Sequence, residues 1–461
     1  MQQNETIRIG KKTFIFSTAV LLVLMIAAGI MTYVLPAGEY QRQEIEGTQQ
    51  IVDGTYQELD TQPLSPIRWL TSPFEVLAGP DGLTIIVIIL FLLFLGGSFT
   101  VLNHSGALVY LVWLLGRKFS KRRYFLISLI SLFFMLLGTA AGIFEESVLL
   151  APVAVALAVG LGFDVFTGLF ISLLSTGFGF AAGVFNPFTT GVAQKLIGLP
   201  VFSGAGFRLI CFAVIYAILT AFIQIYAHKN AKDIDHNASG EPAVSDKAGA
   251  KRALIVFIAL LCTLFAWVAL TSVVRPLADY TMPALAILFL AGGITAGAAS
   301  KMGGKKILKS LLDGVVGVAP GVLLILMASS VKFIMSQSNV LDTLLYIAHN
   351  AMDGLGAGAS ALSTYLLVLI LNFFIGSGSA KAFLVMPIVA PLSSLSGVPL
   401  QSAVLAFLFG DGFSNVFYIT NPVLLITLGI TGVSYAKWFK KTWLLQIITL
   451  AATSLLVLLS I

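Results

Sequence analysis

The chain has 461 residues, of which 58% are apolar and only 10% are charged. Soluble domains carry roughly 25% charged residues, so this composition excludes an ordinary soluble protein. Several apolar runs exceed the length of about 18 residues that marks a membrane-spanning helix, and short charged stretches separate them. The net charge of +6 is better explained by basic cytoplasmic loops than by a nucleic-acid partner.

The first apolar run, from 12 to 35, is longer than the roughly 7–15 residues of a signal-peptide core. We therefore expect a retained first helix, with Lys11 and Lys12 on the cytoplasmic side. Cys211 and Cys262 both lie inside apolar runs, which excludes a disulfide framework, and no metal-ligand spacing is present. No metal or organic cofactor is expected.

The charge pattern sets the expected topology. Basic clusters lie at 11–12, 117–123, 229–252, 301–309 and 437–441. The segment 36–80 is acidic instead. Placing the basic loops inside and the acidic segment outside predicts a multi-pass protein of the bacterial inner membrane with a cytoplasmic N-terminus.

With this topology, about nine segments of the chain cross the membrane completely. They are 12–35, 83–103, 165–198, 206–227, 252–274, 281–300, 313–333, 399–431 and 436–460. The segments 124–162 and 361–397 must enter and leave on one side, so each is predicted to form a re-entrant hairpin of two apolar arms. The short amphipathic segments 105–117 and 339–352 are expected along the membrane interfaces.

The second half of the chain repeats a pattern of the first half at an offset of 235 residues. The matching positions are Pro152 and Pro387, Gly162 and Gly397, Gly177–Phe178 and Gly412–Phe413, and Asn186–Pro187 and Asn421–Pro422. Glycine, proline and asparagine held in one register are not a chance property of apolar helices. The charge pattern orients the two copies oppositely, which is typical of secondary transporters. A symmetric bundle without transport activity is the alternative.

The repeat divides the chain into four expected parts. They are an N-terminal helix with an acidic extracellular loop (1–79), a first copy (80–228, with broken helix 165–198), a cytoplasmic linker with two connecting helices (229–311) and a second copy (312–461, with broken helix 399–431).

Each copy interrupts its apolar pattern twice with small and polar residues. The interruptions are 138–147 and 177–187 in the first copy, and 376–381 and 410–422 in the second. Glycine permits unwinding and proline removes a backbone donor, while asparagine can bond the backbone groups that unwinding releases. The broken helices would then direct their partial charges at a ligand near mid-membrane.

Four ionisable residues are placed near mid-depth: Glu145, Glu146, Lys381 and Asp411. Such a residue costs about 2.5–3.5 kcal/mol on insertion scales, so it is retained when it is paired or functional. Glu146 matches Lys381 at the repeat offset, so the hairpin tips are expected to hold a zwitterion between an acid and a base. A structural Glu146–Lys381 ion pair is the alternative. Asp411 is a candidate for coupling to a proton or Na⁺.

These residues resemble those of the YfcC-type permeases, which are relatives of the anaerobic C4-dicarboxylate carriers within the ion transporter superfamily. The resemblance covers nearly the whole chain. It is most specific at Glu145–Glu146 with Pro152, at 161–168, at 179–188 with Ala193–Gln194, and at 199–204 with Arg208.

The resemblance implies a homodimer in which a mobile transport domain shifts like an elevator against a scaffold domain, with 105–117 and 339–352 as connecting arms. It also implies a substrate site at the hairpin tips and unwound helices. The substrate-binding residues carried over are Glu145, Glu146, Ser147, Asn186, Ser377, Ser379, Lys381 and Asn421, and the ion-coupling candidates are Asp411 and Asn415.

The predicted function is secondary active transport of a small charged metabolite. Two carboxylates at the first tip favour an amino acid, exchanged or taken up with an ion. A C4-dicarboxylate is the alternative, but it would need more than one buried cation, and only Lys381 is convincingly placed. A channel needs a ring of polar groups, an intramembrane protease needs two neighbouring aspartates, and an ATP-driven pump needs a P-loop. The sequence shows none of these patterns, so an enzyme is not expected.

Overall fold

The computed structural model describes residues 11–45, 48–52, 54–119, 122–142, 144–145, 147–231, 244, 246–273, 280–352 and 354–461. Within these ranges the chain is helical almost throughout, and eight helices are long and apolar enough to cross a membrane. This confirms the expected all-α membrane class. Two of the eight spans, Arg123–Ala140 and Ala357–Phe374, are the first arms of the segments predicted as hairpins.

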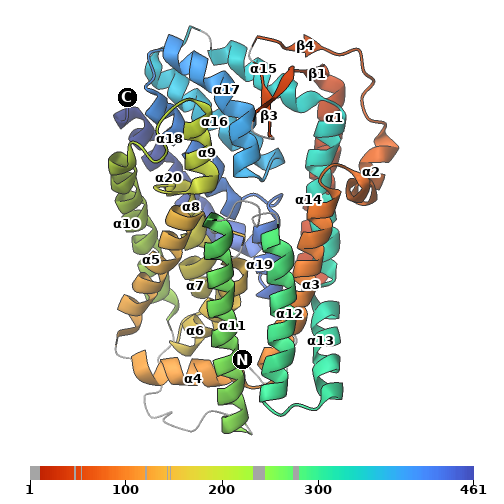
Figure 1. The fold of residues 1–461 in the computed structure, drawn as a ribbon, viewed down its shortest axis with the longest axis vertical. Coiled ribbons are helices and arrows are strands. Elements are labelled where there is room, and N and C mark those ends of the chain that lie inside the picture. The colour runs from red at the N-terminus through yellow and green to blue at the C-terminus, as the bar shows by residue number, and fades with distance from the viewer. Residues whose placement is uncertain are drawn as a thin grey trace.

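One group of helices forms a column along the long axis of the molecule (Figure 1). Its members are α1 (Lys11–Val34), α3 (Gly82–His104), α11 (Lys247–Val273), α12 (Thr281–Ala299), α13 (Gly304–Val318) and α14 (Pro320–Gln337). Helix α3 packs against both α12 and α13, and α1 packs against α14. A Cβ atom added to Gly314 would lie 2.3 Å from the carbonyl oxygen of Gly96, so α3 and α13 cross in backbone contact.

The second group surrounds the broken helices. In the first half it contains α5 (Arg123–Ala141), α6 (Ser147–Gly160), α7 (Val165–Leu169), η3 (Phe170–Leu174), α8 (Ser175–Ala182), η4 (Pro187–Gly191), α9 (Val192–Leu196) and α10 (Ala205–Asn230). In the second half it contains α16 (Ala357–Phe374), α17 (Gly378–Leu395), α18 (Leu400–Gly412), η6 (Phe413–Val416), α19 (Pro422–Ile430) and α20 (Tyr435–Leu459). The most apolar window of the span Val165–Leu196 is 94% buried, against 22% for Ala205–Asn230. The broken helix of the first half is therefore an interior element.

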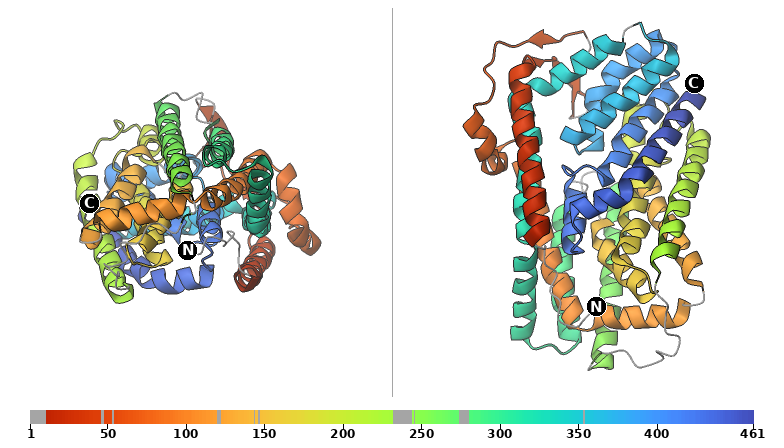
Figure 2. Two further views of the ribbon diagram at one scale, coloured as in Figure 1. Left: turned by 90° about the horizontal axis from the view of Figure 1, so that it is seen from below. Right: turned by 180° about the vertical axis from the view of Figure 1, so that it is seen from behind.

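Two short helices run across the long axis at opposite ends of the molecule (Figures 1 and 2). Helix α4 (Ala107–Phe119) packs against α6, and α15 (Val340–Met352) packs against α16 and α17. The pair α5–α6 lies at the α4 end, and the pair α16–α17 lies at the α15 end. The two helix pairs therefore approach the middle of the molecule from opposite ends. The predicted re-entry of these pairs, and the division into scaffold and transport domains, stay predictions.

The acidic segment after α1 contains more structure than the expected loop. Two antiparallel strand pairs form, β1 (Gly38–Glu39) with β4 (Gln57–Glu58) and β2 (Arg42–Ile45) with β3 (Thr48–Ile51). They are followed by α2 (Pro66–Glu75) and η1 (Val76–Ala78). Strand β3 packs against α17, and β1 packs against α15. This segment therefore covers the α15 end of the molecule.

The crossing predicted at 313–333 begins earlier than its apolar run. Helix α13 starts at Gly304 and leads through Ala319 into α14, which ends at Gln337. The basic residues before 313 do not prevent the helix, because Lys305, Lys306 and Lys309 lie on its exposed side while Ile307 is buried. Proline at position 320 is tolerated because it occupies the first turn of α14, where its missing N–H is not needed.

Candidate functional site

The broken helices are built by the same local geometry in both halves. Asn186 precedes η4, and its Oδ1 accepts hydrogen bonds from the backbone N–H groups of Phe188 (2.9 Å) and Thr189 (3.3 Å). In the second half Asn421 precedes α19, and its Oδ1 accepts from Val423 (2.9 Å) and Leu424 (3.4 Å). Each asparagine thus caps the helix that restarts after the break. The capped and capping positions correspond at the predicted repeat offset.

The turns that end the second helix of each pair also correspond. Gly162 has φ +80° and Gly397 has φ +72°, in the left-handed region that favours glycine. The N–H of the residue after each glycine donates back to a helix carbonyl, from Phe163 to Ala158 (2.9 Å) and from Val398 to Ser393 (2.7 Å). Both turns are the usual glycine termination of a helix. The repeat seen in the sequence therefore has matching local structure at these positions.

The tips of both helix pairs meet the restart of the first broken helix. A Cβ atom added to Gly142, which ends α5, would lie 2.5 Å from Asn186 Oδ1. A Cβ atom added to Gly378, which begins α17, would lie 2.7 Å from Thr189 Cγ2 and 2.8 Å from Asp411 Oδ2. The segment from Asn186 to Thr189 is therefore in contact with both tips, and a larger residue at either glycine would require these side chains to shift.

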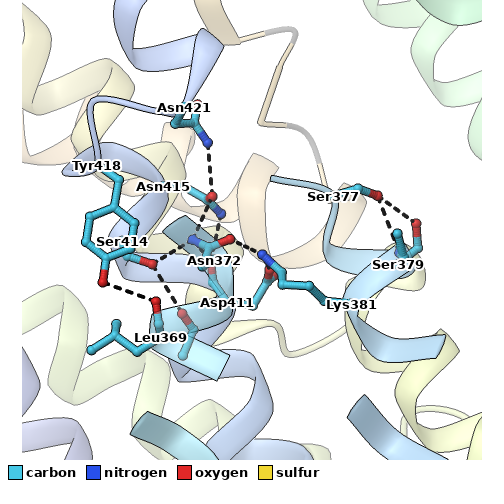
Figure 3. A network of polar contacts seen from close by, with 12 residues as sticks. Leu369, Asn372, Ser377, Ser379, Lys381, Asp411, Ser414, Asn415, Tyr418 and Asn421 are labelled. Carbon is cyan, nitrogen blue, oxygen red and sulfur yellow. Dashed lines mark hydrogen bonds and ion pairs between the residues drawn. The ribbon is translucent and has the colours of Figure 1, made fainter. Parts of the chain in front are cut away.

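A buried ion pair lies beside the second tip (Figure 3). Lys381 Nζ is 2.6 Å from Asp411 Oδ1, and the two side chains are 0% and 1% exposed. Lys381 also donates to Asn372 Oδ1. A buried pair of this kind gains Coulomb energy but loses the hydration of both charges, so its net contribution to stability is small while it is intact. Removing one partner would leave an uncompensated charge.

Amide side chains extend this ion pair toward the second break (Figure 3). Asn372 Nδ2 lies within hydrogen-bonding distance of the Asp411 carbonyl (2.9 Å), Ser414 Oγ (2.6 Å) and Asn415 Oδ1 (3.0 Å). Asn421 Nδ2 donates to the same Asn415 oxygen at 3.0 Å. One network therefore joins α16, α17, α18 and the restart of α19. A change at the ion pair is connected by hydrogen bonds to the helix break.

Some polar atoms at this position have no partner within the described residues. Asn186 Nδ2 and Thr189 Oγ1 are buried and make no hydrogen bond, and both side chains are 0% exposed. The carboxylate oxygens of Asp411 accept no hydrogen bond beyond the contact with Lys381. Buried polar groups are nearly always bonded, so each exception calls for a partner such as a water molecule, an ion or a ligand. These atoms can therefore provide a donor, a hydroxyl and an acceptor to a polar ligand.

The residues expected at the first tip lie as follows. Glu145 is exposed, and Glu146 lies outside the described residues, so its expected approach to Lys381 stays a prediction. Ser147 is buried and donates to the carbonyl of Phe144 at 2.6 Å, which is a local bond within the turn. Among the described residues, the carboxylate that pairs with Lys381 is Asp411, which the sequence had suggested only as an ion-coupling candidate.

At the second tip, the Oγ atoms of Ser377 and Ser379 are 3.4 Å apart, and Ser377 is exposed. Asn415 and Asn421 belong to the amide network described above. The described residues contain no group of three histidine, cysteine or carboxylate side chains that could hold a metal ion. Both cysteines are free, Cys211 buried and Cys262 exposed.

The sequence interpretation missed Asn372 and Thr189. Asn372 carried a usable signal, because it is a lone amide in the apolar run 361–375 and such residues face the protein interior. Thr189 gave a weaker signal, because a threonine can bond its own helix and then needs no other partner. Neither residue has a polar counterpart at the repeat offset, where leucine occupies positions 137 and 424.

Comparison with known proteins identifies the family of this chain. The model of the C4-dicarboxylate anaerobic carrier (DcuC) family matches residues 15–461. The chain belongs to this family. It is 28% identical over 467 aligned residues to YfcC of Escherichia coli, covering 91% of each protein, and that protein's name assigns it provisionally as a basic amino acid antiporter. It is also 24% identical to an uncharacterized protein of Haemophilus influenzae, covering 93% of this chain and 94% of the relative.

Two solved transporters resemble the structure at low similarity. They are the Alcanivorax borkumensis YdaH transporter (TM-score 0.43, 16% identity, covering 96% of this chain and 97% of that one) and Neisseria gonorrhoeae MtrF (TM-score 0.42, 17% identity, covering 96% and 94%). TM-scores below 0.5 support no detail of this carrier's structure.

Family membership and the apolar helices establish the broad class. The chain is a multi-pass membrane protein that transports a small molecule, and the expectation that it is not an enzyme is confirmed by the family. The predicted relation to YfcC-type permeases is confirmed as well.

Proposed function

We propose that this carrier moves an amino acid across the bacterial inner membrane, by exchange with a related amino acid or by uptake coupled to an ion. One observation supports the site above all others. The unpartnered Asn186 Nδ2 and Thr189 Oγ1 lie where both helix-pair tips meet, and the Lys381–Asp411 pair adjoins the same tip. Such a set offers hydrogen bonds and both signs of charge, which is what an amino acid requires.

The substrate-binding residues proposed are those at the tips and the restarts of the broken helices. They are Glu145, Glu146, Ser147, Asn186, Ser377, Ser379, Lys381 and Asn421, to which we add Thr189. Exposed Glu145 would supply the charge for a second amino group. The name of YfcC, a basic amino acid antiporter on a provisional basis, favours the same substrate class.

A C4-dicarboxylate is the second candidate, and one structural observation favours it. Arg208 is only 3% exposed and contacts no carboxylate in the described part of the chain. Arg208 therefore supplies a second buried positive charge. The first, on Lys381, is neutralised by Asp411. The sequence interpretation had disfavoured a dianion because it found only Lys381. The family name points in the same direction.

The proposed coupling site is Asp411 with Asn415, binding H⁺ or Na⁺. Asp411 has two carboxylate oxygens and one cationic partner, and the Asn415 side chain donates to the Asp411 carbonyl at 2.8 Å. Protonation of Asp411 would release Lys381 for a substrate carboxylate, so proton binding and substrate binding would be linked.

The proposed mechanism is alternating access by two oppositely oriented copies within a homodimer, with a cytoplasmic N-terminus. The placement of α5–α6 and α16–α17 at opposite ends supports opposite orientation, and the transverse helices α4 and α15 are positioned to connect a scaffold to a moving domain. In the proposed elevator motion, the moving domain would carry the site past a fixed barrier.

The experiment is uptake of labelled arginine, ornithine and succinate into proteoliposomes, with and without the same compound inside. Amino acid uptake that is accelerated by internal amino acid supports the proposal, and succinate transport without amino acid transport replaces it with the second candidate. Thr189→Val should raise the substrate KM about tenfold, because one hydrogen bond to the ligand is lost.

The matched control is Thr427→Val, because Thr427 is equally buried and its hydroxyl bonds the carbonyl of Val423 in its own helix. This change should leave KM unaltered. Equal effects of the two substitutions would remove Thr189 from the site.

A further inference from the structure

We infer that Arg208 is a positioning residue that holds the break of the first broken helix, and through it Asn186 and Thr189, in the geometry described above. This inference rests on the proposed function of the site, but its structural test does not require a substrate. It concerns the motif 199–204 with Arg208, which is not among the substrate-binding residues proposed for an amino acid.

The break leaves backbone groups of residues 183–185 outside any helix, and Thr139 of α5, Thr190 of η4 and Arg208 of α10 bond several of them. Thr190 Oγ1 donates to the carbonyl of Gly183. The N–H of Val184 donates to Thr139 Oγ1 (2.9 Å), and the N–H of Phe185 donates to the Thr139 carbonyl (3.0 Å). Buried backbone groups must be paired in this way, so the partners of the break fix its path.

The carbonyl of Val184 accepts hydrogen bonds from Arg208 of α10. Arg208 Nε and Nη2 donate to it at 3.4 and 3.3 Å. The same guanidinium donates to the Phe202 carbonyl (3.2 Å) and to Gln401 Oε1 (3.4 Å). The planar group thus spreads its donors over three acceptors, a geometry that a lysine ammonium cannot reproduce.

Gln401 and Gln194 extend the contact to the second half of the chain. Gln194 Nε2 donates to Gln401 Oε1 at 3.0 Å, and Gln401 Nε2 donates to Ser203 Oγ at 2.6 Å. Gln194 Oε1 accepts from the N–H of Phe202 at 2.6 Å. Phe202 has φ +62°, a conformation that a non-glycine residue keeps only when its surroundings enforce it. The loop before α10 is therefore held tightly, which fixes the position of Arg208.

The second break offers a comparison within the same chain. Its carbonyls at Val416 and Phe417 accept from Trp438 Nε1 (2.8 Å) and the Tyr435 hydroxyl (2.9 Å) on α20. In both halves the helix that follows the broken helix therefore bonds the break, but neutral donors suffice in the second half. Tyr435→Phe is the matched control for a change at Arg208.

The test measures the exposure of the break by cysteine labelling. Phe185 is 43% exposed beside Val184, and Cys262 is the exposed native cysteine. In the purified Phe185→Cys/Cys262→Ser protein, Arg208→Gln should raise the rate of maleimide labelling roughly tenfold, because the bonds to a charged donor are lost. Arg208→Lys should raise it nearly as much, and Tyr435→Phe should not change it.

Labelling at the parental rate in Arg208→Gln overturns the inference. Labelling at the parental rate in Arg208→Lys overturns it too, because charge alone would then suffice. If Arg208→Gln does not give a single gel-filtration peak, the labelling rates of Arg208→Lys and Gln401→Leu are measured in its place. Rates above the parental rate support the inference, and the parental rate in both overturns it. If labelling rises while none of arginine, ornithine and succinate is transported, the proposed function fails and the positioning role stands. When a substrate is transported, Arg208→Lys should raise its KM more than it lowers the maximal rate.

Discussion

The ion pair between Lys381 and Asp411 is the residue-scale feature on which the site depends. Both charges are fully buried, and their mutual contact of 2.6 Å compensates the hydration that each has lost. Asn372 accepts from Lys381 and donates to the Asp411 carbonyl, so the same amide bonds both residues. A structural pair and a functional pair look alike in this geometry, and they differ in what happens when both charges are removed.

We predict that the losses of unfolding free energy caused by the two single substitutions of this pair will not add up in the double variant. Lys381→Met or Asp411→Leu alone should lower the free energy of unfolding by about 3–5 kcal/mol, because each leaves a buried unpaired charge. The double variant should lose far less, because no charge remains. The measurement is unfolding by SDS in mixed micelles for all four proteins. Additive losses would contradict the prediction. A stable double variant that still transports substrate would make the pair purely structural.

The residue types of the site were predictable from the sequence, but the pairing of Lys381 with Asp411 was not. A lysine and an aspartate in apolar segments must be buried and compensated, so Lys381 and Asp411 could be selected on energetic grounds. Pairing by repeat offset points to Glu146, which lies outside the described residues, so that pairing stays a prediction. The partner seen for Lys381 comes from α18 of its own half. That choice depends on how α17 packs on α18, which no local pattern encodes.

At the scale of elements, the strand segment after α1 is a strap that joins α15 to α17. We use the name strap for residues 38–58. Arg42 Nη2 forms an ion pair with Asp342 of α15 at 2.8 Å, and Tyr56 stacks on Tyr346 with ring centroids 4.0 Å apart. Tyr40 and Ile51 of the strap are buried in one apolar cluster with residues of α17. The strap therefore cannot separate from α17 without exposing apolar surface.

We predict that Arg42→Ala will loosen the strap. Asp342 is nearly buried, with only 8% of its side chain exposed. Within the described residues its carboxylate accepts from Arg42 and from the Tyr40 N–H, so removing Arg42 leaves the Tyr40 N–H as its remaining partner. Removing the charged partner of a buried acceptor lowers stability by about 1–3 kcal/mol. Hydrogen exchange of strap peptides, measured by mass spectrometry, should accelerate about tenfold, since 1.4 kcal/mol corresponds to a factor of ten.

Arg68→Ala is the matched control, because Arg68 and Glu75 form an ion pair at 2.6 Å on the exposed helix α2. Exposed pairs contribute little, so strap exchange should not change. A hydrogen bond from Arg68, with a second from Thr71, holds the pKa of Glu75 below its usual range. The small stability from this pair is therefore present above the usual glutamate pKa and is lost as pH falls through the lowered value. Equal acceleration in both arginine variants would contradict the role of Asp342.

Element boundaries followed the sequence where apolar length decides them, and departed from it where tertiary contacts decide. Helix α3 occupies Gly82–His104 against a predicted 83–103, because its apolar run ends at polar residues on both sides. The strap was predicted as loop, since its short strands are stabilised by α15 and α17 rather than by their own pattern. The early start of α13 was not predicted, because its first turns contain three lysines. A segment with that many charges has the composition of a solvent-exposed loop.

For the whole molecule, the central question is whether the two copies face opposite sides of the membrane. The long axis has α4 at one end and α15 at the other, and the first arms of the two helix pairs, α5 and α16, begin near these opposite ends. Arg122 precedes α5 and Gly356 precedes α16, so the two positions are nearly equivalent in the repeat. Opposite orientation requires that they lie on different sides of the bilayer.

We predict that cysteines at these positions will react from opposite sides. Arg122 is exposed, and a Cβ atom at Gly356 or Gly303 meets no atom within 4 Å, so cysteine fits at all three sites. In cells carrying the Cys262→Ser background, an impermeant maleimide should label Gly356→Cys directly. It should label Arg122→Cys only after permeabilisation. Gly303→Cys, in the basic turn before α13, is the cytoplasmic reference and should behave like Arg122→Cys, because basic loops stay inside. Direct labelling of both Arg122→Cys and Gly356→Cys would place the copies in parallel, and alternating access through oppositely oriented copies would then be impossible for this chain.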